Sequence, residues 1–151
     1  MKPDNEVVSP FRPMITLPIF NFSIINSKEY TQIYRNKGIT LSFYLIEKNK
    51  PILWLPDNIK IDSSLEYFND FIDKYDIAYN LYKKREISTD IVWLNNTEVS
   101  HKLLKCWYVQ ILAFPEKQDN INLRDCLKIF PYKNKLRFKN LREVGKNGKI
   151  T

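Results

Sequence analysis

An acidic residue, Asp90, stands among apolar residues in the stretch KREISTDIVWLNN at positions 84–96. The run favours a buried strand, and burying a carboxylate is expensive unless something binds it. Alternate residues of a strand share a face. One face would carry Ser88, Asp90 and Val92, and the other Ile87, Ile91 and Trp93. A carboxylate on that first face need not point into the main core and could line a cleft.

Few other side chains suggest catalysis. His101 is the chain's one histidine and follows Ser100 near the start of an expected helix. It could act as a base, because histidine titrates near neutral pH, although such a residue more often belongs to a helix surface. Cys106 and Cys126 lie twenty positions apart with no CxxC motif, which excludes the common zinc spacings and favours two small core residues. Neither a Walker motif nor GxGxxG, GxSxG or HExxH occurs.

Positive charge is concentrated at the C-terminal end. Residues 124–151 contain nine Lys or Arg against two acids, whereas residues 1–123 contain fifteen of each sign, so the net charge of +7 belongs to the C-terminal segment. A local basic patch favours an acidic partner, which could be nucleic acid, anionic lipid or an acidic protein. A solubilising tail is the plain alternative.

The rest of the sequence predicts a cytoplasmic protein with reduced thiols. The start, MKPDNEVVSP, has no apolar core of a secretory signal, and no window approaches the roughly 18 apolar residues of a membrane span. An apolar fraction of 44% is enough to build a core. The length of 151 residues predicts one domain covering 1–151.

Periodicity and breakers predict the elements around Asp90. In chain order these are an arm (1–15), an extended start and a helix (27–36), a hairpin (38–56), a helix (62–82), a strand (86–94), a helix from Thr97 to Pro115, a loop (116–122), a second hairpin (123–144) and a frayed end (145–151). The order favours an α/β (α+β) domain with a mainly antiparallel sheet flanked by helices.

The stretch around Asp90 resembles the signature D-R-x-W-x-I-D-W-I-A-P-F-G of the RTX toxin-activating lysine acyltransferases. Arg85 and Asp90 fall on its Arg and Asp at equal spacing. VVSPFR at 7–12 is similar to the family's S-P-x-H-R, and residues 38–58 to its proline-containing hairpin. LEYFND at 65–70 and LRFKNLREVGKNGK at 136–149 follow in the family's order.

The resemblance implies an N-acetyltransferase-like fold and the transfer of a fatty acyl group from acyl carrier protein to internal lysines of a protoxin. It implies that Asp90 is the catalytic carboxylate and that Arg85 binds substrate or carrier. Lys135, Arg137 and Lys139 lie on the basic hairpin that would attract the acidic carrier. No bound cofactor or metal is expected, since acyl-[acyl carrier protein] is the co-substrate, and a homodimer is compatible with this interpretation.

The chain also departs from the pattern. Arg12 stands where the family has its catalytic histidine, and Trp93-Leu94-Asn95-Asn96 replace A-P-F-G. Two alternatives therefore stay open. One is a relative that has lost the base and acts as a binding module. The other, less favoured, is a nucleic-acid binder that uses the C-terminal hairpin and its aromatic residues.

Overall fold

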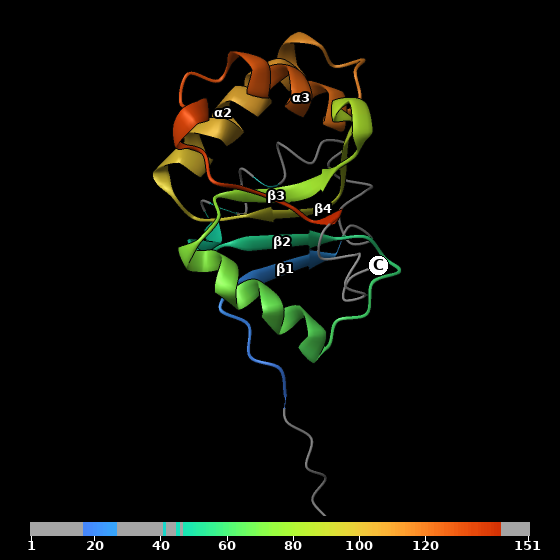
Figure 1. Ribbon diagram of the computed structural model, residues 1–151, viewed down its shortest axis with the longest axis vertical. Coiled ribbons are helices and arrows are strands. Elements are labelled where there is room, and N and C mark those ends of the chain that lie inside the picture. Colours follow the sequence, from blue (N-terminus) through green and yellow to red (C-terminus); the bar gives the residue numbers. More distant parts are fainter. Residues whose placement is uncertain (1–16, 27–40, 42–44, 46, 143–151) are drawn as a thin grey trace, which may run out of the picture.

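The apolar run around Asp90 forms the central strand of a five-stranded sheet (Figure 1). The computed structural model describes residues 17–26, 41, 45 and 47–142. In these residues the strand order is β1-β2-β4-β3-β5. The strands are β1 (Ser23–Asn26), β2 (Ile52–Leu55), β3 (Ile77–Leu81), β4 (Ile87–Leu94) and β5 (Phe138–Asn140). Isoleucine, valine and tryptophan dominate β4, as expected for a strand covered on both faces.

Helices cover the two faces of this sheet. On one side lie α2 (Glu98–Ala113) and α3 (Asp119–Ile129), and on the other the 3₁₀ helix η2 (Ser63–Asp73) (Figure 1). Two short 3₁₀ turns, η3 (Lys83–Arg85) and η4 (Lys133–Lys135), lie in connections. The prediction of a single α+β domain with one sheet flanked by helices is confirmed.

Strand directions make the sheet mixed. β4 pairs antiparallel with both β2 and β3. The outer pairs, β1 with β2 and β3 with β5, are parallel. The antiparallel expectation therefore holds around β4 and fails at both edges. The edges are parallel because β1 and β5 join the sheet through long connections and not through hairpins.

Two apolar cores lie on opposite sides of β4. The α-side core lies under α2 and α3 and includes Val92, Leu94 and Trp107. The η-side core lies under η2 and includes Trp93 and Phe68. From Ile91 to Leu94, successive residues of β4 thus alternate between the two cores, which explains why this part of the strand is a continuous apolar run.

The predicted strand 86–94 and the helix that follows it are confirmed. Thr97 is the N-cap of α2, where its side chain accepts a hydrogen bond from the backbone N–H of Ser100 (3.3 Å). The helix ends at Ala113, before Pro115, which has no backbone N–H to donate. Local signals were sufficient here because cap, periodicity and breaker agree.

The predicted helix 62–82 is too long. η2 starts after its N-cap Asp62 as expected but ends at Asp73, and residues 77–81 form β3. β3 is drawn into the sheet between β4 and β5. Tertiary pairing therefore overrides the helical pattern that continues through Tyr75.

The predicted C-terminal hairpin 123–144 is wrong. Its first strand is the helix α3, which already begins at Asp119 within the expected loop 116–122. Only β5 is extended, and it pairs with β3. Buried positions of this segment, namely Leu123, Cys126 and Phe130, are spaced as on a helix, whereas Ile129 is 63% exposed.

The hairpin predicted over 38–56 is confirmed in its second strand alone, which is β2. Among the described residues of the first half, Leu41, Leu45 and Glu47 have helical backbone, and β2 pairs with β1 and β4. The extended start before residue 27 is β1. The predictions for the arm 1–15, the helix 27–36 and the end 145–151, and the position of Arg12, lie outside the described residues.

Candidate functional site

The β3–β4 connection places Arg85 in an unusual backbone conformation. Its φ is 63°, in the left-handed region that favours glycine. Two backbone hydrogen bonds close the connection, from Tyr82 N–H to Glu86 O (2.7 Å) and from Glu86 N–H to Lys83 O (3.4 Å). The Arg142 guanidinium lies over the Tyr82 ring at 4.7 Å. The tight turn thus imposes the strained geometry on Arg85, at a cost of about 1–2 kcal/mol.

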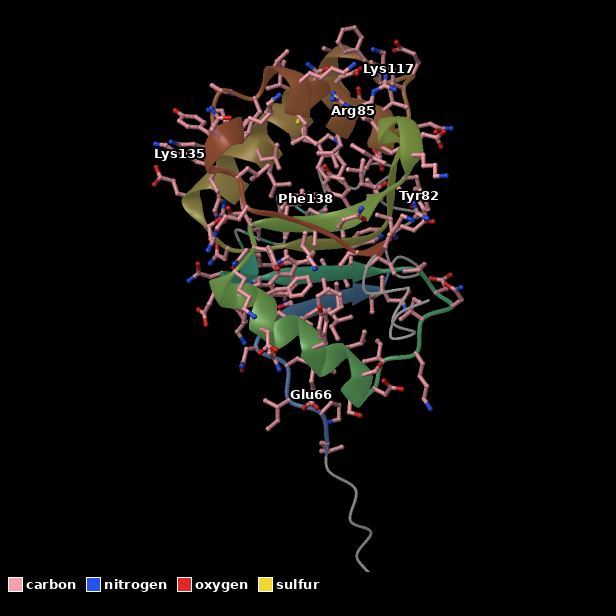
Figure 2. The ribbon with its side chains drawn as sticks, viewed as in Figure 1. Glu66, Tyr82, Arg85, Lys117, Lys135 and Phe138 are labelled. Carbon is pink, nitrogen blue, oxygen red and sulfur yellow. The ribbon has the colours of Figure 1, made fainter. Side chains whose placement is uncertain are left out.

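Arg85 borders a pocket of about 400 Å³ between this connection and α3. Figure 2 shows Arg85 on the side of the strands that α2 and α3 cover. The pocket is lined by Tyr79, Leu81, Arg85, Ile87, Arg124, Leu127, Lys128 and Lys133. A hydrogen bond from Asn120 Nδ2 to Ile87 O (3.0 Å) attaches the first turn of α3 to the start of β4. We call this the basic pocket.

The cations of the basic pocket are poorly neutralised. Arg124 has a nearby acid, since its Nη2 lies 3.3 Å from Asp125 Oδ1. Within the part of the chain that the structure describes, Arg85, Lys128 and Lys133 form no ion pair. The pocket therefore has an excess of positive charge close to an apolar floor.

The floor of the basic pocket consists of strand and helix residues. Tyr79 is 6% exposed, and its ring packs on Phe138 with the centroids 4.5 Å apart. Burial, with a smaller contribution from Cys126, raises the pKa of Tyr79 above its ordinary value, so its hydroxyl stays protonated. Leu81, Ile87 and Leu127 complete the floor. The pocket can thus receive an apolar group beneath an anionic one.

Asp90 is exposed and lies in an irregular part of β4. Its backbone N–H points to Ser88 Oγ at 3.4 Å. Ser88 pairs with Asn80, and Trp93 pairs with Ala78, so β4 advances five residues while β3 advances two. The three extra residues form a bulge around Asp90.

The bulge corrects the predicted alternation of faces. Because the bulge adds an odd number of residues to β4, the side chains after it lie on the opposite face from the one that strict alternation would give them. Ile87 and Val92, expected on opposite faces, both belong to the α-side core, whereas Ile91 belongs to the η-side core. Asp90 itself is exposed, as the bulge permits, and does not line the basic pocket.

The histidine lies away from Asp90. His101 Nε2 is 2.7 Å from Asn96 Oδ1, beyond the carboxyl end of β4. Asp90 precedes Leu94, the last residue of β4, by four positions, so it lies before the strand end that Asn96 follows. Because His101 is the one histidine of the sequence, no imidazole of this chain lies beside Asp90.

The predicted carrier-binding cations of the C-terminal segment do not line the basic pocket. Arg137 binds Asp76, with Nη2 to Oδ1 at 3.0 Å and Nε to Oδ2 at 3.3 Å. Lys139 lies over the Tyr75 ring at 5.9 Å, and Lys135 is exposed in η4 (Figure 2). Of the five predicted site residues, Arg85 alone lines the basic pocket.

Sequence reasoning missed three pocket cations as site residues, namely Arg124, Lys128 and Lys133. The charge count included them, but the hairpin interpretation placed Arg124 and Lys128 on a strand and Lys133 in the turn after it. Residues four positions apart share one face of a helix, so Arg124 and Lys128 lie on the same face of α3. The helical spacing was therefore the signal that could have identified them.

Two further observations concern metal ligands and membrane-spanning helices. The described ranges contain no group of three or more His, Cys, Asp or Glu that could hold a metal ion. None of the helices found in these ranges has the length and hydropathy needed to cross a membrane.

Comparison of the chain with protein-family models, with curated proteins and with solved structures finds no match.

Proposed function

We propose that this protein is a cytoplasmic protein-lysine fatty acyltransferase, similar to the RTX toxin activators, with an N-acetyltransferase-like fold. It moves an acyl group from acyl carrier protein to internal lysines of a protoxin. The basic pocket is the observation that carries this proposal. It combines cations suited to an acidic carrier with an apolar floor suited to an acyl chain, beside the strand that bears Asp90.

The reaction converts a thioester and a lysine amine into an amide and a thiol. A lysine of pKa about 10.4 is protonated at pH 7 and must lose a proton before its nitrogen can attack the thioester carbonyl. The carbon–sulfur bond then breaks, and the carrier's sulfur leaves as the thiol. Asp90 is exposed, so its carboxylate can approach an incoming lysine and accept the proton that the attacking nitrogen loses as the amide forms.

One observation favours a second candidate, a binding module without turnover. The chain's one histidine is held at Asn96 and away from Asp90, so the proton acceptor of the first proposal has no histidine candidate. Such a module would bind the acyl carrier or the protoxin and transfer nothing. The nucleic-acid alternative relied on a C-terminal hairpin, and the expected first strand of that hairpin is the helix α3.

Co-expression with acyl carrier protein and a protoxin tests the two candidates. The acyltransferase predicts a mass increment of one acyl group on protoxin lysines, measured by intact-mass and peptide mass spectrometry. Carrier binding without any increment would favour the binding module. Neither binding nor an increment would contradict both.

Asp90→Asn is expected to lower the acylation rate about 100-fold, because the neutral amide cannot accept the lysine proton. The fold should survive, since Asp90 is exposed. The initial rate of lysine acylation is the measurement. Asp70→Asn, which neutralises an exposed acid of η2, is the matched control and should keep the full rate. Equal rates for the Asp90 variant and the unaltered protein would remove the assigned role.

A further inference from the structure

The basic pocket has two kinds of lining, and together they define a ligand class. Four cations, Arg85, Arg124, Lys128 and Lys133, share it with an apolar floor. We propose that it binds a small organic phosphate ester, with the phosphate among the cations and an apolar organic part on the floor.

The charges of the basic pocket favour a phosphate over a carboxylate. Arg85, Lys128 and Lys133 form no ion pair with the residues that the structure describes. Cations gathered in one concavity repel each other, and a bound anion removes that repulsion. A phosphate monoester has up to two negative charges and three free oxygens, so it can accept hydrogen bonds from several of these side chains at once.

The backbone of Arg85 is a second, independent observation. Its φ of 63° costs energy for any side chain with a Cβ, and glycine would adopt it without strain. Arginine stands there nevertheless, and it lines the basic pocket. Strain of this kind is concentrated at ligand-binding sites, and a guanidinium suits phosphate because it can donate two parallel hydrogen bonds.

The size and floor of the pocket argue for a small ligand with an apolar part. About 400 Å³ lies within the range of small-molecule sites. Leu81, Ile87 and Leu127 offer hydrocarbon, and Tyr79 adds a protonated hydroxyl among them. A bare inorganic phosphate would leave this floor in contact with water. A polynucleotide would need a track of cations along an extended groove.

The phosphate ester has two sources that share this chemistry. One is a free small molecule. The other is the prosthetic arm of an acyl carrier protein, whose phosphate is a diester with one negative charge and two free oxygens, and which would serve the proposed acyltransferase. Binding at the pocket requires no acyl transfer, so it can be tested whether or not the chain acylates lysine.

Isothermal titration of the full chain with n-hexyl phosphate, inorganic phosphate and 1-hexanol tests the proposal. We expect n-hexyl phosphate to bind at least about tenfold more tightly than either of the others, because it alone uses both linings. Competition by holo acyl carrier protein, but not by its apo form, would assign the arm as the source. Absence of competition would assign the free ester.

Two variants connect the binding to the pocket. Arg85→Gly and Lys128→Gln should each weaken n-hexyl phosphate binding about tenfold, since each removes one charged donor. Arg85→Gly should keep or raise the melting temperature, because glycine relieves the strained φ. Lys60→Gln removes an exposed cation on the segment between β2 and η2 and is the control of equal charge change.

Three results would overturn the proposal. One is equal affinity for n-hexyl phosphate and 1-hexanol. Another is an equal loss of affinity in the Lys60 control and in the two pocket variants. The third is binding seen with phosphatidylglycerol vesicles alone and not with soluble n-hexyl phosphate, which would assign the cations to a lipid surface.

Discussion

Replacement of Asp76 by alanine is expected to lower the free energy of unfolding by about 3 kcal/mol or more. The Asp76 side chain is 2% exposed. It accepts hydrogen bonds from the Arg137 backbone N–H (2.8 Å), the Arg137 guanidinium and the Thr97 hydroxyl (2.9 Å). Alanine leaves these donors without their acceptor and removes the side-chain links from Asp76 to the residue before β5 and to the N-cap of α2. Urea unfolding followed by circular dichroism gives the free energy.

The same carboxylate predicts a dependence of stability on pH. Burial alone would raise the pKa of Asp76, but hydrogen bonds from Arg137 and Thr97 hold it below its ordinary value. A pKa that is lower in the folded than in the unfolded state contributes stability above the unfolded value of about 3.9. That contribution is lost as the pH falls through the folded pKa. The difference between the unaltered protein and Asp76→Ala should therefore shrink in acid.

Two comparisons control this prediction. Asp76→Asn keeps the shape but loses the charge, and should cost less than alanine. Asp70→Ala removes an exposed acid and should change the free energy by no more than about 0.5 kcal/mol. A loss below 1 kcal/mol in Asp76→Ala, or a difference that does not change between pH 7 and pH 3, would contradict the role assigned to Asp76.

The sequence predicted β4 and α2 because their signals are local. β4 is a run of β-branched and aromatic residues, and α2 has its own cap, apolar face and terminating proline. β3 was missed for the opposite reason. IAYNL is too short to define a period, and it is extended because β4 and β5 pair with it on both sides. Such pairing depends on residues far away in the chain.

The start of the C-terminal segment was predicted as a strand and is a helix, because its apolar residues fit the periods of both. Leu127 and Ile129 alternate with basic residues as in a strand, yet Leu123, Cys126, Leu127 and Phe130 also match one face of a helix. The burial of individual residues decides between a strand and a helix. Leu123 is fully buried and Ile129 is 63% exposed, although a strand would place these two residues, six positions apart, on the same face; a helix separates them.

The candidate site could be predicted in part. Arg85 was identified, but its neighbours Arg124, Lys128 and Lys133 come together only once α3 is a helix packed beside the β3–β4 connection. Arg137 looked like another exposed cation in the sequence. The structure instead gives it the buried Asp76 as a partner, and no local pattern reveals that pair.

The environment of Asp90 was also predicted incorrectly from the sequence. Its occurrence in an apolar strand suggested that it faces a cleft, on the assumption of strict alternation. The bulge between the Ser88 and Trp93 pairs breaks that alternation and leaves Asp90 exposed. A bulge depends on the partner strand, so the sequence of β4 alone could not predict it.

Trp93→Ala is expected to lower the free energy of unfolding by about 3–5 kcal/mol. Trp93 is fully buried at the centre of the η-side core. Its ring centroid lies 5.4 Å from that of Phe22, 5.9 Å from Phe68 and 5.7 Å from Phe71. These residues come from β4, the segment before β1, and η2, so alanine would leave a cavity where three parts of the chain meet.

Trp93→Phe separates ring packing from the indole hydrogen bond. Phenylalanine keeps an aromatic ring but loses volume and the N–H that Trp93 directs to Tyr75 O at 3.4 Å. That contact is long, so most of the loss in the alanine variant should come from packing, and phenylalanine should recover more than half of it. Ile61→Ala, at a side chain that is 47% exposed, is the control and should change the free energy little. Equal losses for Trp93→Phe and Trp93→Ala would show that the indole N–H, and not the packing of the ring, stabilises this core.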